Sequence, residues 1–76
     1  MPLQQDMGVP VTLQTIRQRI VRIASAAVRG DYDTAHGAED KLFEDVLRAV
    51  AAGYAGRDEA AAALKSRELV FVRRTA

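Results

Sequence analysis

A single glycine separates two long helical patterns, and this junction constrains the fold more than any other feature of the sequence. Gly30 ends a run whose apolar residues recur at intervals of 3 and 4, and a second helical pattern begins at about Tyr32. A connection of so few residues makes two helices antiparallel neighbours. The sequence therefore predicts an antiparallel helix hairpin, with Gly30 in the left-handed conformation that commonly ends a helix.

The first predicted helix runs from about Leu13 to Arg29, with Thr12 as its N-cap. Its apolar residues follow an a/d pattern, which is typical of a helix that packs along one stripe. We expect this stripe to face the second helix and, in a homodimer, to join two copies of the chain. The stripe comprises Leu13, Ile16, Ile20, Ile23 and Ala27.

The second predicted helix runs from about Tyr32 to Ala52, and a short alanine-rich helix from about Asp58 to Arg67 follows it. Leu64 is the expected anchor of the third helix. The stretch 69–72 has no strand to pair with inside the chain, so we expect a turn or coil unless it pairs with a partner's edge. The apolar stripe of the second helix comprises Leu42, Phe43, Val46, Leu47, Val50 and Tyr54.

The predicted fold is all-α, with one domain over residues 11–76. It is an antiparallel two-helix hairpin closed by a short third helix and a C-terminal tail. Residues 1–10 contain Pro2, Gly8 and Pro10 without any apolar period, and we expect them to form a flexible arm. A chain of 76 residues buries a small core, so we expect about 4–10 kcal/mol of stability and a benefit from association.

The composition excludes several classes of protein. The chain has no cysteine, so it has neither disulfides nor thiolate metal ligands. It has no apolar run near the ~20 residues of a membrane span and no signal-peptide pattern. There is no glycine-rich phosphate loop, no second histidine and no nucleophile paired with a base. We therefore expect a cytoplasmic protein that is not an enzyme and needs no cofactor.

The charges are segregated along the chain. Residues 7–30 hold four arginines and no acid, whereas residues 31–45 hold six acids and one lysine, for −6 + 1 = −5. Arg19, Arg22 and Arg29 fall opposite the apolar stripe of the first helix. Arginines on one helix face can contact phosphates, so a nucleic-acid-binding regulator is an alternative function. No aromatic residue lies among them for base stacking.

Three polar residues break the helical pattern: Arg17 and Glu39 lie within apolar stripes, and His36 lies one turn before Glu39. A buried carboxylate without a partner is costly, so we expect Glu39 to form an ion pair between helices. Arg17 is one candidate partner, although Arg22 and Arg29 match Glu39 better in height along the hairpin. His36 and Glu39 at i, i+3 could share a metal, but two ligands are too few within one chain. We expect no metal site.

The stretch from Asp33 to Gly53 resembles a group of small proteins of unassigned activity from actinobacteria and their phages. Their pattern is roughly A-x-x-x-E-D-x-L-x-x-x-V-L-R-A-I-A-x-G, often with a histidine before the acids, and an "A-L-x-T/S … F-x-R" tail. The resemblance covers residues 31–74 but lacks the tryptophan usual near the C-terminus, where this chain has Arg74. It implies a phage or prophage accessory protein in a bacterial cytoplasm. The matching residues are Ala35, His36, Glu39, Asp40, Leu42, Val46, Leu47, Arg48, Ala49, Val50, Gly53, Ala63, Leu64, Phe71 and Arg73.

The function expected from these features is binding of a protein partner, either a host protein or a second copy of the chain. Apolar residues in excess of what one hairpin needs are the basis for this expectation. A structural phage component is a further alternative. We expect Arg73 and the residues after it to be solvated. The predicted interface comprises Leu13, Ile16, Ile20, Ile23, Tyr54 and Phe71.

Overall fold

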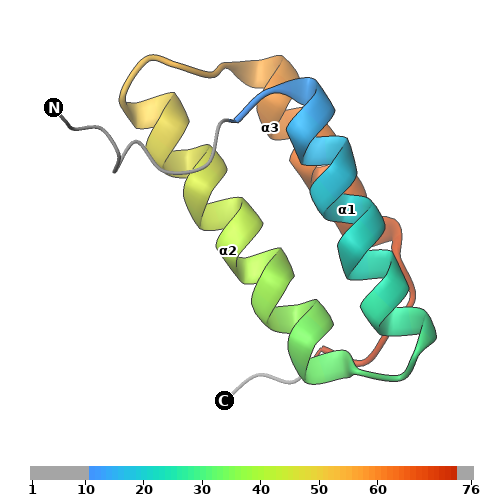
Figure 1. Cartoon of the computed structure of the whole chain (residues 1–76). Helices are drawn as coiled ribbons and strands as arrows, with labels where there is room; N and C mark the ends of the chain where they lie inside the picture. Colours follow the sequence, from blue (N-terminus) through green and yellow to red (C-terminus); the bar gives the residue numbers. More distant parts are fainter. Residues whose placement is uncertain (1–10, 74–76) are drawn as a thin grey trace, which may run out of the picture.

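The computed structural model describes residues 11–73, and in this range the chain is all-helical, as predicted. It forms α1 (Leu13–Val28), α2 (Tyr32–Ala51), α3 (Arg57–Leu64) and a 3-10 helix, η2 (Lys65–Glu68) (Figure 1). Helix α1 runs antiparallel to α2, and α3 packs against both. The arm predicted over residues 1–10 lies outside the described residues.

Side chains cap the N-termini of both long helices. Thr12 and Thr15 form a capping box, in which each backbone N–H donates to the other residue's hydroxyl, at 3.1 and 2.9 Å. The carboxylate of Asp31 accepts from the N–H of Thr34 at the start of α2. These bonds satisfy donors that a helix leaves free in its first turn, which explains why the hairpin helices begin where they do.

Schellman motifs end α1 and α2. Gly30 has a φ of 79°, and its N–H donates to the carbonyl of Ala27. The N–H of Asp31 donates to the carbonyl of the residue before Ala27. Gly53, with a φ of 85°, ends α2 in the same way, and the N–H of Tyr54 is held at the last turn of that helix. Only glycine adopts this conformation at no steric cost. The predicted role of Gly30 is confirmed.

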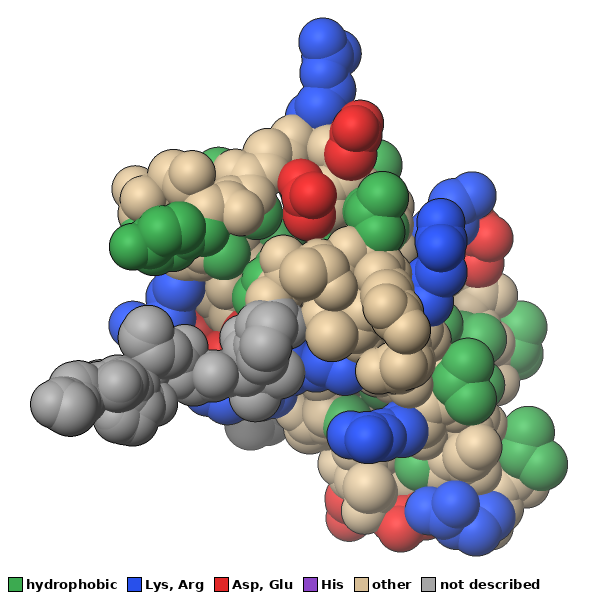
Figure 2. Space-filling model, turned by 45° about the horizontal axis from the view of Figure 1, so that its top comes forward, with side chains coloured by type: hydrophobic (Ala, Val, Ile, Leu, Met, Phe, Trp, Pro, Cys, Tyr) green, Lys and Arg blue, Asp and Glu red, His purple; other side chains and the backbone are tan. Residues whose placement is uncertain are grey.

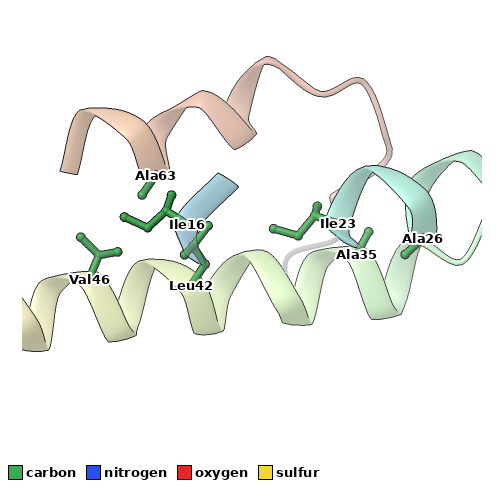
Figure 3. Close-up of a cluster of buried hydrophobic side chains, with 7 residues drawn as sticks. All are labelled: Ile16, Ile23, Ala26, Ala35, Leu42, Val46 and Ala63. Atoms are coloured by element: carbon green, nitrogen blue, oxygen red, sulfur yellow. The ribbon is translucent and has the colours of Figure 1, made fainter. Parts of the chain in front are cut away.

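The core lies between the three helices (Figure 3). Helix α3 contributes Ala63, whereas Leu64, which was predicted to anchor this helix, is 60% exposed. The small side chain lets α3 approach the hairpin closely, and the larger one points away from it. The buried apolar residues are Ile16, Ile23, Ala26, Ala35, Leu42, Val46 and Ala63.

The third helix is shorter than predicted, and the tail follows it as a coil. Helix α3 ends at Leu64 and the chain tightens into η2, where a single helix from Asp58 to Arg67 was expected. No strand forms in residues 69–73, in agreement with the prediction. This segment returns toward the start of α2, where the ring of Phe71 stacks on Tyr32 at 6.4 Å between centroids (Figure 1).

Candidate functional site

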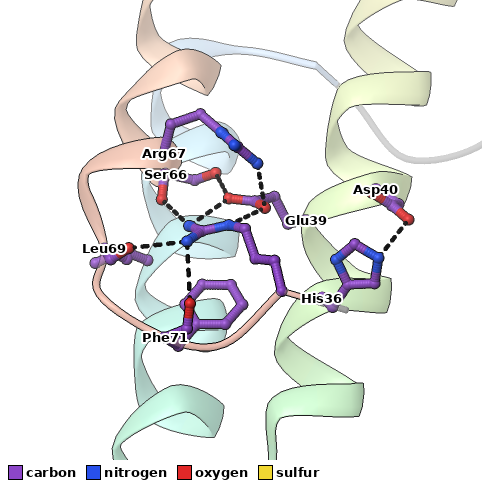
Figure 4. Close-up of polar contacts among 8 residues, drawn as sticks. His36, Glu39, Asp40, Ser66, Arg67, Leu69 and Phe71 are labelled. Atoms are coloured by element: carbon purple, nitrogen blue, oxygen red, sulfur yellow. Dashed lines mark hydrogen bonds and ion pairs between the residues drawn. The ribbon is translucent and has the colours of Figure 1, made fainter. Parts of the chain in front are cut away.

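Glu39 is buried in the middle of α2, and both of its carboxylate oxygens accept hydrogen bonds (Figure 4). The hydroxyl of Ser66 and Nη2 of Arg73 donate to Oε2, and Nε of Arg73 donates to Oε1 at 2.7 Å. Nη1 of the half-exposed Arg67 lies 3.4 Å from Oε1. The residue is 1% exposed, so its charge is neutralised almost entirely by other side chains rather than by water. We call these four residues the Glu39 cluster.

Arg73 uses every donor that a guanidinium has. Two of its N–H groups form the fork to Glu39, and the remaining three point to backbone carbonyls of Ser66, Leu69 and Phe71 at 3.0–3.4 Å. An arginine carries five such donors in a fixed planar arrangement. The guanidinium carbon also lies 3.8 Å from the centre of the Phe71 ring, in cation–π contact. Arg73 therefore holds the tail in a defined loop and ties it to α2.

The environment of Glu39 favours its charged form. Burial alone raises the pKa of a carboxyl, but the hydrogen bonds from Arg73 and Ser66 and the charges of Arg73 and Arg67 outweigh this and lower the pKa of Glu39 below 4.5. The same contact raises the pKa of Arg73. Glu39 is thus a weak base, and the pair remains charged throughout the physiological pH range.

The lowered pKa of Glu39 predicts an acid-dependent loss of stability. The unfolded state binds a proton at Glu39 more readily than the folded state, so the contribution of this residue is complete above about pH 5 and declines as the pH falls through the lowered pKa. Urea unfolding should be measured between about pH 7 and about pH 3 for the wild type and for Glu39→Gln. The difference between their free energies of unfolding should become smaller as the pH falls. A difference that stays constant over this range would contradict the ion pair.

The predicted partners of Glu39 were wrong, although its burial and its ionic pairing were anticipated. Arg17, Arg22 and Arg29 are exposed and make no ion pair among the described residues. The carboxylate instead pairs with Arg73, whose side chain is only 16% exposed, although it was predicted to be solvated. The tail pattern F-x-R was the available signal, because it places an arginine after an apolar anchor.

His36 does not share a ligand site with Glu39. Its Nε2 lies 3.4 Å from the carboxylate of Asp40, which is one turn further along α2. Its Nδ1 is buried without a hydrogen-bond partner. Both oxygens of Glu39 point toward the tail instead (Figure 4). Residues 11–73 contain no group of three potential ligands that could hold a metal.

Helix α2 presents two apolar faces. Leu42 and Val46 point into the core, whereas Leu47 is 70% and Val50 40% exposed. At about 100° per residue, Leu42 and Leu47 lie about 140° apart around the helix. Phe43, which is partly buried at the edge of the core, lies one turn before Leu47. Tyr54, which is 84% exposed, follows in the turn after the helix. We call these four residues the outer face of α2.

The outer face of α2 lies near one end of the molecule. Figure 2, which brings the top forward, shows hydrophobic side chains exposed at its left, on the side where α2 ends, and others along its right side. Large apolar side chains at helical spacing without a covering element are typical of contact surfaces. Within α2, the exposed pair Glu44 and Arg48 lies beside this face and forms a hydrogen-bonded ion pair at 2.7 Å.

The structure divides the predicted interface. Ile16 and Ile23 are 1% and 0% exposed within a single chain, so they are unavailable to a partner unless the fold opens. Ile20 and Phe71 pack against the same core, and Leu13 is partly exposed. Tyr54 is the member of the set that lies open. The a/d pattern of α1 is satisfied by α2 and α3, which leaves no equivalent seam for a second copy.

The arginines proposed for nucleic-acid contacts differ in their surroundings. Nη1 of Arg19 lies 2.9 Å from the carboxylate of Asp45, so this arginine joins the two long helices. Arg22 is exposed at the edge of a groove between α1 and α2, and Arg29 lies outside that groove at the end of α1. Arg19 is therefore tied to Asp45, whereas Arg22 and Arg29 remain exposed on the helix face that the nucleic-acid alternative uses.

None of the helices in the described range is both long and apolar enough to cross a bilayer. Comparison of the chain with protein-family models, with curated proteins and with solved structures finds no match.

Proposed function

We propose that this protein is a non-enzymatic helical module that binds a protein partner through the outer face of α2. The observation that carries the proposal is the exposure of Leu47 and Val50 toward the end of α2 and of Tyr54 in the turn that follows it. A chain with so small a core gains by burying these side chains against a partner. The resemblance to actinobacterial and phage proteins supports a phage or prophage accessory role in a bacterial cytoplasm, with a host protein or a second copy as the partner.

The Glu39 cluster supports a structural role rather than catalysis. Ser66 is fully buried and its hydroxyl donates to a carboxylate whose pKa is lowered by ion pairing. A serine nucleophile needs a base that can accept its proton and needs access to substrate. Neither condition is met here, since Arg73 occupies the carboxylate and the tail covers the hydroxyl.

The proposed surface predicts a selective loss of binding on substitution of Leu47. Leu47→Asp should reduce recovery of the partner from actinobacterial lysate at least tenfold, because it places a charge at the centre of the apolar contact. Val21→Asp is the matched control, since Val21 is 63% exposed and belongs to α1 rather than to α2. Affinity capture with and without nuclease, read by mass spectrometry, measures both.

Two results would change this assignment, and a third measurement covers the case of a homodimer. Loss of recovery after nuclease treatment would favour the nucleic-acid alternative. Equal recovery with Leu47→Asp and the wild type would exclude the outer face as the contact. If the partner is a second copy, light scattering should give a dimer for the wild type and for Val21→Asp but a monomer for Leu47→Asp.

A further inference from the structure

The groove between α1 and α2 has more hydrogen-bond donors than acceptors. It has a volume of about 410 Å³, within the range of about 300–1,000 Å³ common for ligand sites. Residues of α3 and the tail do not line it, so it lies apart from the Glu39 cluster. It does not include the outer face of α2 either. The lining residues are Thr15, Gln18, Arg19, Arg22, Ala38, Lys41 and Asp45.

Positive charge predominates in this groove. Asp45 serves both Arg19, at 2.9 Å, and Lys41, at 3.3 Å, so one carboxylate is shared by two cations. Arg22 is exposed and has no ion-pair partner among the described residues. The three cations and one carboxylate leave a local charge of +3 − 1 = +2. This excess is local, because the whole chain carries only +1.

Arg19 lines the groove with one of its donors, Nη1, in an ion pair but without a hydrogen bond. Its side chain is 16% exposed, and Nη1 is buried without a hydrogen bond although it lies close to Asp45. The proximity supplies charge attraction, but the angle does not make a hydrogen bond. A guanidinium forms its strongest contacts through well-aligned hydrogen bonds, and an anion with several oxygens would supply further acceptors to Arg19 and to the exposed Arg22.

We propose that this groove binds a phosphate group, with Arg19, Arg22 and Lys41 as its cationic contacts. Phosphate presents multiple acceptors in a geometry that guanidinium groups match, and its charge offsets the local excess. The group could belong to a small phosphorylated molecule or to a nucleic-acid backbone, and both sources present the same chemistry. The site is separate from the protein-binding surface proposed above and does not depend on it.

Titration of the full chain, observed by nuclear magnetic resonance, tests the groove. The probes are inorganic phosphate, adenosine monophosphate, unphosphorylated adenosine and a single-stranded oligonucleotide. We expect saturable shifts of the Arg19 and Arg22 Nε–H signals and of amides that line the groove. Saturation by adenosine monophosphate would assign a small ligand, and saturation by the oligonucleotide alone would assign a nucleic-acid backbone. No saturation by any phosphate-bearing probe, or equal shifts with adenosine, would overturn the proposal.

Matched arginine substitutions separate a built site from diffuse attraction. Arg22→Gln should raise the dissociation constant about tenfold, whereas Arg17→Gln removes the same charge from an exposed position of α1 outside the groove and should leave it nearly unchanged. Equal weakening by the two variants would contradict the site. Leu47→Asp should leave phosphate binding intact. A failure of the phosphate site can therefore be distinguished from a failure of the proposed protein contact.

Discussion

Replacing Glu39 by alanine is expected to lower the free energy of unfolding by about 3–5 kcal/mol. The substitution leaves the guanidinium of Arg73 enclosed by the tail without its counter-charge and leaves the buried Ser66 hydroxyl without its acceptor. For a chain whose expected stability is about 4–10 kcal/mol, this loss is a large part of the total. Thermal and urea unfolding followed by circular dichroism measure it, with about 4–8 °C in Tm for each kcal/mol.

Two further variants make this result specific to the cluster. Glu44→Ala removes an exposed carboxylate that pairs with Arg48 on the same helix, and its unfolding midpoint should be unchanged. Replacing Glu39 and Arg73 together by leucine should recover much of the stability, because it leaves no unpaired charge. If Glu39→Ala destabilises the chain no more than Glu44→Ala does, the tail is not tied to α2 in solution.

Replacing Leu42 by alanine is expected to cost about 2–5 kcal/mol, whereas the same change at Leu47 should alter stability by no more than about 0.5 kcal/mol. Leu42 is 0% exposed and Leu47 is 70% exposed, although both lie on α2 and both occur in one apolar stripe of the sequence. The first substitution opens a cavity between the helices, and the second removes surface already in contact with water.

The pair of leucine variants tests the two-faced description of α2 without reference to any partner. Both variants remove the same atoms from the same helix, so differences in helix propensity cancel. Similar losses at the two positions, measured by urea unfolding, would show that Leu47 is buried in solution. That outcome would remove the basis for the outer face of α2.

The helices could be predicted because their determinants are local. The intervals of 3 and 4 in α1, the caps at Thr12 and Asp31 and the glycine at position 30 all act within a few residues of where they stand. The end of α3 was harder to predict from the sequence. The change from α-helix to 3-10 helix after Leu64 accompanies the burial of Ser66 against Glu39, which is a contact between distant segments.

The partner of Glu39 could not be predicted from helical geometry. A helical wheel shows that the residue faces inward, but it does not show which distant segment arrives there. Arg73 lies 34 positions later in a segment with no helical period. A helical wheel separates Leu42 from Leu47 by about 140°, but which of the two is buried depends on where α1 and α3 pack, and periodicity in α2 alone does not specify that.

Site-specific photo-crosslinking in bacterial cells tests the central claim, that the outer face of α2 contacts a protein, most directly. A photoreactive amino acid would replace Leu47, which is 70% exposed, in one variant and Val21, which is 63% exposed on α1, in the other. The account predicts a discrete, nuclease-resistant protein adduct from position 47 and none from position 21. An adduct from position 21 alone, or the same adducts from both positions, would contradict it.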